Sequence, residues 1–193
     1  QVLPIFIFDK EILSKLPEND ARVSFIHDTL QRMRKHLQEE YECSIAMYHS
    51  SPIDAFKTII EDFNVKTVFT NRDYEPYAKN RDKKISDFLK ENEIEFKTFK
   101  DQVIFEKSEI VKSDGDPYVV YTPYKNKWQE QFNADRDLDI HYTSQYLSNL
   151  IKNTRLPNLS LRDIGFEKSK IEVPDYDVTT TLIDNYEDTR NFP

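Results

Sequence analysis

Polar side chains that could bind a ligand directly follow one apolar stretch of the chain. Residues 65–69 are rich in β-branched and aromatic side chains, as in a buried strand, and the polar run Asn71 to Asp73 marks its carboxyl end. Pro76 suits the first turn of a helix, with Glu75 near the positive end of that helix. In open α/β sheets, ligands bind at the edge formed by the carboxyl ends of the strands. The sequence therefore predicts the rim of a binding site at this turn.

The sequence carries no recognisable catalytic or metal-binding motif. Its only glycines, Gly115 and Gly165, lie outside any expected strand-to-helix turn, which excludes a glycine-rich phosphate-binding loop. No His-Glu-x-x-His or Gly-x-Ser-x-Gly motif occurs. Cys43 is the only cysteine, and His27 and His36 lie on opposite faces of a helix, where we expect both to be exposed. We predict no catalytic residue and no metal site in this chain.

Apolar strands and amphipathic helices alternate along the first hundred residues. The strands are expected at residues 2–8, at 43–48, from 65 onward and at 94–99. The helices are expected from a cap at Asn19 or Asp20 to about Glu40, after the capping residue Ser51, and from Pro76. This alternation predicts an α/β fold, an open, Rossmann-like parallel sheet with helices on both faces, joined by right-handed crossovers.

The composition indicates a soluble, highly charged protein. Of the 193 residues, 38% are hydrophobic and 32% are charged, and no run is long enough to span a membrane, so we expect a cytoplasmic protein with no membrane partner. The formal net charge is -8. A domain that grips a phosphate backbone usually presents a basic face, so this part of the protein is not expected to hold a nucleic acid.

The composition changes after Asn133 to polar residues with scattered prolines, which is typical of a linker. We therefore predict an α/β domain at residues 1–132 and a long, irregular connector at 133–193. A short helix is expected to begin at Pro123. Within the connector, residues 161–166 and a helix at 180–186 are expected to pack on a surface.

Three segments resemble, in the same order, motifs of the DNA photolyase and cryptochrome family. They are Asn-x-Asp-Tyr-Glu-Pro-Tyr-Ala-x-x-Arg-Asp at 71–82, Val-Tyr-Thr-Pro-Tyr-Lys-Asn-Lys-Trp at 120–128, and Tyr-Glu-Asp-Thr-Arg-Asn-Phe-Pro at 186–193. The resemblance spans nearly the whole chain and implies the amino-terminal, antenna-binding α/β domain of that family. The family has an earlier strand and an arginine-rich turn with no counterpart here, so we expect an excised piece or an undefined start.

The resemblance also implies a function for the parent protein. In a DNA photolyase, a reduced flavin, excited directly or through an antenna chromophore, donates an electron to a pyrimidine dimer and splits it. The FAD, the electron-relay tryptophans and the groove for damaged DNA belong to a carboxy-terminal helical domain that is absent here. We expect this fragment to bind the antenna, to contact its own helical domain, and to have no repair activity alone.

Five residues are candidates for contact with the chromophore. Phe6 at the end of the first strand, Arg22 in the first helical turn, and Asp73 with Glu75 can converge at one sheet edge, and by resemblance they match positions that hold a deazaflavin or flavin antenna. Tyr77 could stack on a ring or pack within its helix. A folate antenna is disfavoured, because Tyr77 and the next residue stand where folate-binding members often have an amide and a carboxylate.

Each candidate also has a simpler interpretation. Phe6 could be ordinary core, Arg22 could pair with Asp20 or Glu18, and Asp73 could cap the following helix. Glu75 could form an ion pair with Arg81.

Three other functions remain open at this point. The first is a cryptochrome, a signalling photoreceptor with the same amino-terminal fold. The second is a stand-alone nucleotide-binding α/β module such as a stress protein, against which the scarcity of glycine and the segment 186–193 argue. The third is a structural domain with no ligand.

Overall fold

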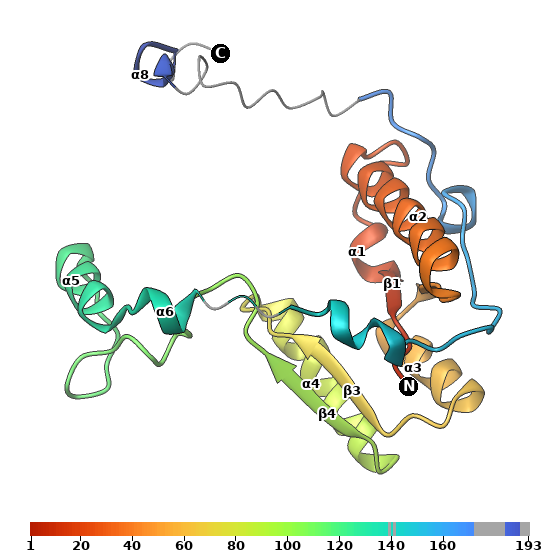
Figure 1. The fold of residues 1–193 in the computed structure, drawn as a ribbon, viewed down its shortest axis with the longest axis horizontal. Helices are drawn as coiled ribbons and strands as arrows, with labels where there is room; N and C mark the ends of the chain where they lie inside the picture. The colour runs from red at the N-terminus through yellow and green to blue at the C-terminus, as the bar shows by residue number, and fades with distance from the viewer. Residues whose placement is uncertain (139, 141, 172–183, 190–193) are drawn as a thin grey trace.

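Strands and helices alternate as expected through the first half of the molecule (Figure 1). The computed structural model describes residues 1–138, 140, 142–171 and 184–189. In this half the elements are β1 (Ile5–Asp9), α1 (Lys10–Leu13), α2 (Ala21–Tyr41), β2 (Ala46–Ser50), α3 (Pro52–Asp62), β3 (Thr67–Asn71), α4 (Pro76–Glu91) and β4 (Glu95–Phe99). The predicted α/β class is confirmed.

All strand pairing in these elements is parallel, and it occurs in two separate pairs. β1 pairs with β2 from Ile5↔Ala46 to Asp9↔Ser50. β3 pairs with β4 in register from residue 67 opposite 95 to residue 71 opposite 99. Parallel strands need crossover connections, and the helices α2 and α4 supply them.

The first strand is shorter and lies later in the chain than predicted. It begins at Ile5, after Pro4, while Val2 instead forms a bridge with Leu150. Phe6 is therefore the second residue of β1 and not its end, which is a correction to the prediction. The carboxyl end of the strand is Asp9.

Local sequence signals fix where the helices begin. The Asp20 carboxylate accepts a hydrogen bond from the backbone N–H of Arg22 at 2.9 Å and caps α2. The Ser51 hydroxyl accepts one from the N–H of Asp54 at 3.2 Å and caps α3. Pro76 is the first residue of α4, where its missing N–H costs nothing. These three predicted helix starts are confirmed.

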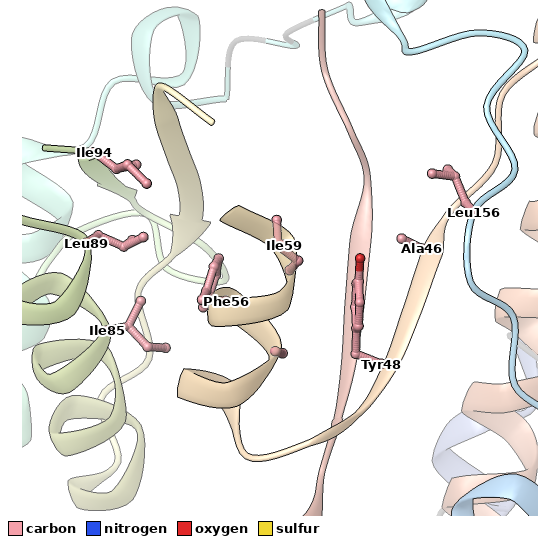
Figure 2. Close-up of a cluster of buried hydrophobic side chains, with 9 residues drawn as sticks. Ala46, Tyr48, Phe56, Ile59, Ile85, Leu89, Ile94 and Leu156 are labelled. Carbon is pink, nitrogen blue, oxygen red and sulfur yellow. The ribbon is translucent and has the colours of Figure 1, made fainter. Parts of the chain in front are cut away.

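Helices cover both faces of the β1–β2 pair. One face contributes Ala46 to a buried cluster that includes Ile59 of α3, and Figure 2 shows α3 lying against these strands. The opposite face contributes Met47 to a second buried cluster that includes Leu30 of α2. The pair is thus the centre of a three-layer arrangement.

Direct packing of α3 on α4 joins the two pairs of strands. In Figure 2, Phe56 of α3 faces Ile85 and Leu89 of α4, and all three belong to one buried cluster. The side chain of Leu89 is fully buried. Because α4 also packs on β4, this cluster fixes the β3–β4 pair relative to β1–β2.

Among the described helices, α4 packs on the β3–β4 pair, and it covers one face of it. Phe69, expected in a buried strand, is 62% exposed and stacks on exposed Phe99 with ring centroids 6.1 Å apart. The expectation of burial was wrong for Phe69, because alternate residues of a strand point to opposite faces and α4 covers only the other one. The alternation predicted for 94–99 is confirmed.

The later part of the chain consists of short elements. They are α5 (Tyr121–Gln131), α6 (Ala134–Asp137), η1 (Ser144–Asn149), η2 (Arg162–Ile164) and α8 (Tyr186–Thr189). The helix predicted to begin at Pro123 starts two residues earlier, and most of the helix predicted at 180–186 lies outside the described residues. None of the helices in the described ranges is both long and apolar enough to cross a membrane.

Residues 156–166 pack back against α2 and bury a histidine. Ile164 and Phe166 are buried in the same cluster as residues of α2, so the expected packing of 161–166 is confirmed. His27 is only 8% exposed, and its Nε2 lies 2.9 Å from the carbonyl oxygen of Leu159. The prediction that His27 is exposed was wrong, because a segment about 130 residues away in the sequence covers it.

Candidate binding site at the carboxyl ends of β1 and β3

A cavity of about 360 Å³ lies between β1 and β3. Its volume is near the lower end of the range of small-molecule pockets. Most of its walls are apolar side chains from both strands and from α3 and α4. The lining residues are Ile5, Phe6, Ile7, Asp9, Ile12, Pro52, Phe56, Val68, Phe69, Thr70, Arg81, Asp82, Ile85 and Phe96. Its polar groups come from Asp9 and Thr70, at or near the carboxyl ends of the two strands, and from α4.

Asp9 is the buried carboxylate of this site. It is 7% exposed, and its Oδ1 accepts a hydrogen bond from the backbone N–H of Glu11 at 2.9 Å. Its Oδ2 accepts a short hydrogen bond from the hydroxyl of Tyr77. These two hydrogen bonds offset the free-energy cost of burying the carboxylate.

Tyr77 remains protonated and donates to Asp9 at neutral pH. Partial burial of its ring and the hydrogen bond to the Asp9 carboxylate both raise the pKa of its hydroxyl well above the usual value near 10. The ammonium of Lys15 lies 5.8 Å from the centroid of the ring, within cation–π range. Tyr77 thus connects the start of α4 to the end of β1.

Phe6 lines the same cavity as this carboxylate. Its ring meets Phe8 edge to face at 4.9 Å and packs on the cluster shared with α2. Phe6 therefore has a structural role in the core and also presents an aromatic surface to the cavity.

Arg81 forms an ion pair, but not with Glu75. Its guanidinium lies 2.8 Å from the carboxylate of Asp82, and both side chains are mostly buried at the cavity wall. The suggested pairing of Glu75 with Arg81 was wrong.

Asp73 and Glu75 form a local turn before α4. Asp73 Oδ1 accepts a hydrogen bond from the backbone N–H of Glu75 at 3.1 Å, and both side chains are exposed. Arg72 and Tyr74, beside them, bind the carboxylate of Glu106 at 2.9 and 3.0 Å. Part of the polar turn therefore anchors the loop that follows β4.

Arg22 pairs with Asp20, the residue that caps its own helix. Its guanidinium forms two hydrogen bonds with the carboxylate of Asp20, at 3.0 and 2.7 Å. Asp20 is one of the two partners that the sequence suggested for Arg22. The hydrogen bonds from Arg22 lower the pKa of Asp20 to about 2.

We expect Arg22→Ala to raise the pKa of Asp20 toward its usual value near 3.9. Since the folded pKa of Asp20 is depressed, its stabilising contribution is present above about pH 4 and is lost as the pH falls toward 2. Titration of the Asp20 carboxyl by NMR measures the shift, with Arg32→Ala on the same helix as the control. An unchanged Asp20 pKa in Arg22→Ala would contradict the pairing.

The five predicted residues fall into two groups. Tyr77 donates a hydrogen bond to Asp9, and Phe6 lines the same cavity as Asp9. Arg22 instead pairs with Asp20, and Asp73 and Glu75 are exposed and joined by a local hydrogen bond. Sequence reasoning missed Asp9, Lys15 and Arg81. Asp9 could have been predicted by the argument applied to Asn71, because Asp9 is also the first polar residue after an apolar strand. In the described ranges, no three acidic, histidine or cysteine side chains gather closely enough to hold a metal ion.

Sequence comparisons relate most of the chain to known proteins. The family model of DNA photolyase matches residues 1–141. A deoxyribodipyrimidine photo-lyase of Halobacterium salinarum is 28% identical over 207 residues, covering 100% of this chain and 41% of that protein. One from a Synechococcus species is 27% identical over 131 residues, covering 68% of this chain and 27% of that protein. The chain thus spans less than half the length of either relative.

Solved structures show the same architecture. A class III photolyase from Agrobacterium tumefaciens superposes with a TM-score of 0.66 at 19% identity, covering 97% of this chain and 35% of that one. A photolyase from Sulfolobus tokodaii superposes with a TM-score of 0.51 at 26% identity, covering 58% of this chain and 26% of that one.

Proposed function

The chain belongs to the DNA photolyase family, and from this premise we propose that it forms the amino-terminal part of a light-driven pyrimidine-dimer photolyase. The observation that carries the proposal is the family match over residues 1–141, together with relatives that are named deoxyribodipyrimidine photo-lyase. Because the chain spans less than half of those relatives, FAD, damaged DNA and the electron transfer are assigned to a helical domain outside these residues. The net charge of -8 supports that division, since this part would repel a phosphate backbone.

This part of the protein would hold the antenna chromophore at the rim around Asp9 and Tyr77. When bound, such a chromophore supplies excitation energy to the flavin of the parent protein. The residues present fit a planar ring, because Phe6 offers an aromatic surface in the cavity wall and Asp9 and Arg81 provide charged groups there. Tyr77 and Lys15 lie at the edge of the site, where Tyr77 binds Asp9 and Lys15 lies over the ring of Tyr77. The Tyr77–Asp9 hydrogen bond would hold this edge of the site in one conformation. A ligand would then lose less side-chain entropy on binding.

We favour an antenna of the flavin or deazaflavin type over folate. The Sulfolobus tokodaii photolyase, which is 26% identical, is described with two FAD molecules and an implied novel light-harvesting cofactor. Phe6, Arg22, Asp73, Glu75 and Tyr77 remain the proposed contacts. Arg22 and Asp73 would have to exchange their present partners, Asp20 and the Glu75 N–H, for the ligand. We also keep residue 132 as the proposed boundary between the α/β domain and the connector.

Absorption and repair measurements test this division of labour. We expect the full-length parent, purified from a host that makes folates, flavins and deazaflavins, to show a flavin band that this chain lacks, with any antenna band in one or both. Under near-ultraviolet or blue light, the parent should split pyrimidine dimers and this chain should not.

Two outcomes would contradict the proposal. Dimer cleavage by the 193-residue chain alone would show that the catalytic machinery is not elsewhere. A flavin-loaded parent that never repairs dimers would indicate a cryptochrome-type photoreceptor. The dark reaction serves as the control, because a light-independent signal cannot come from this chemistry.

A further inference from the structure

The segment 156–169, here called the strap, lies alongside α2 and is held by a row of polar side chains (Figure 1). The row consists of Ser24, His27, Gln31 and Arg34, whose spacing places them on one face of the helix. At one end, the N–H of Ser169 donates to the hydroxyl of Ser24 at 2.8 Å. At the other end, the Arg34 guanidinium donates to the carbonyl of Pro157 at 3.1 Å. The row therefore binds mainly the backbone of the strap.

The hydrogen bonds around His27, within this row, determine its tautomer. Its Nε2 lies 2.9 Å from the carbonyl oxygen of Leu159, which can only accept a hydrogen bond. The Gln31 amide donates to that same carbonyl at 3.1 Å and to the Asn158 side chain at 2.9 Å, which uses both of its hydrogens. In the neutral ring, Nε2 therefore carries the hydrogen and Nδ1 carries a lone pair. Nδ1 is buried, and no hydrogen bond reaches it within the described part of the chain.

Asp28 and Lys168 affect the His27 ring differently. Asp28 Oδ1 lies 3.7 Å from Nδ1, but Asp28 belongs to the same helix and stays beside His27 whether or not the strap is docked. Lys168 belongs to the strap, and its ammonium lies 3.5 Å from Asp28 Oδ2, so docking brings a cation toward the ring. From the strands, uncharged Phe8 and Met47 face this row. Docking thus removes water from the ring and adds a positive charge nearby, and both effects favour the neutral form.

We propose that His27 is a pH-sensitive latch, which holds the strap on α2 while its ring is neutral and releases it when the ring takes up a proton. Protonation places a charge and an unpaired N–H where the strap excludes water, whereas the released ring is hydrated and still has Asp28 beside it. Docking is therefore strongest above about pH 7.5 and weakens as the pH falls through about 6.5, where a hydrated histidine titrates. Because the strap is part of the predicted connector, the attachment of this domain to the rest of the parent would depend on pH.

His49 and Asp163 also titrate beside the strap. His49 Nδ1 lies 3.3 Å from the carbonyl oxygen of Asp163, but this ring is only half-buried, so its charged form keeps contact with water. Hydrogen bonds from Ser160 lower the pKa of Asp163, so the turn that these two residues form persists in mild acid. His27 is thus the group that we expect to control release.

Amide hydrogen exchange of the 193-residue chain tests the latch without any light-dependent readout. The amides of Met47 and Ser169 report on docking, because they donate to Pro157 and Ser24 across the contact. Their protection should fall by up to about tenfold between about pH 7.5 and 5.5, because one unit below its midpoint a released histidine is about ten parts charged to one part neutral. The amide of Leu89 should stay better protected at every pH, since release of the strap does not require α4 to unfold.

Three histidine variants assign this pH dependence to one residue. His27→Gln keeps an N–H donor for the Leu159 carbonyl but does not titrate, so its protection should no longer depend on pH. His49→Gln and His36→Gln are the matched controls, and both should behave as wild type, because His36 is exposed on the same helix. Nitrogen chemical shifts of the wild-type ring at about pH 7.5 should show the hydrogen on Nε2.

Several results would overturn the latch. A fall of less than about twofold in wild type would mean that the strap does not respond to pH. An undiminished fall in His27→Gln, or its loss in His49→Gln, would assign the effect to another group. Equal protection of Leu89 and the strap amides would mean that the chain opens only by global unfolding. The wild-type comparison and His49→Gln decide the matter even if His27→Gln does not fold.

Discussion

Replacing Leu89 by alanine is expected to lower the free energy of unfolding by about 2–5 kcal/mol. Leu89 is fully buried in the cluster that joins α4 to α3, as Figure 2 shows. The shorter side chain removes apolar contacts and leaves a cavity where the two helices meet. Urea denaturation followed by circular dichroism measures the change.

The neighbouring substitution Lys90→Ala is the control for this experiment. Lys90 is exposed on the same helix, and alanine is a good helix former, so its effect should stay within about 0.5 kcal/mol. If Leu89→Ala behaved like this control, α4 would not be docked on α3 as described. A loss confined to residues of β3, α4 and β4 in hydrogen exchange would show that this unit can detach from the rest.

Replacing Tyr77 by phenylalanine should cost about 1.5–3 kcal/mol, the usual value of a hydrogen bond to a charged group. The ring still packs, but the buried Asp9 carboxylate loses one of its two donors and keeps only the N–H of Glu11. Tyr41→Phe is the matched control, because Tyr41 has a ring contact with His36 but no hydroxyl hydrogen bond in the described structure. Thermal or urea unfolding measures both variants.

The same bond predicts a dependence on alkaline pH. The folded pKa of Tyr77 is raised above its unfolded value near 10, so its contribution is fully present below about pH 10 and is lost as the pH rises further. Wild type should therefore lose stability above pH 10 more steeply than Tyr77→Phe, with both compared by urea midpoints across that range. If the two stability–pH curves ran parallel, the hydrogen bond to Asp9 would not be what keeps the Tyr77 hydroxyl protonated.

The order of elements could be predicted because the signals for it are local. Caps such as Asp20 and Ser51 act on backbone groups two or three residues away, and the apolar period of a helix or strand is written in a short window. The three family motifs are also short, contiguous segments. For the same reason, boundaries that depend on pairing, such as the start of β1 at Ile5, were displaced by a few residues.

The candidate site was predicted only in part. A rim of polar residues at the carboxyl ends of strands follows from parallel topology, and it led to the turn around Asp73. The partners of those residues do not follow from topology, because each side chain pairs with the nearest complementary group. Arg22 pairs with Asp20, and Arg72 pairs with Glu106, a residue 34 positions further along the chain.

The α/β class, the helix starts and the family could be predicted, since each depends on residues that are neighbours in the chain. The hydrogen bond between Tyr77 and Asp9, 68 residues apart, and the burial of His27 beneath the segment around Leu159 follow only from the folded arrangement. So does the cavity between β1 and β3. These outcomes depend on how helices pack between distant strands, and packing is set by contacts that no local pattern records.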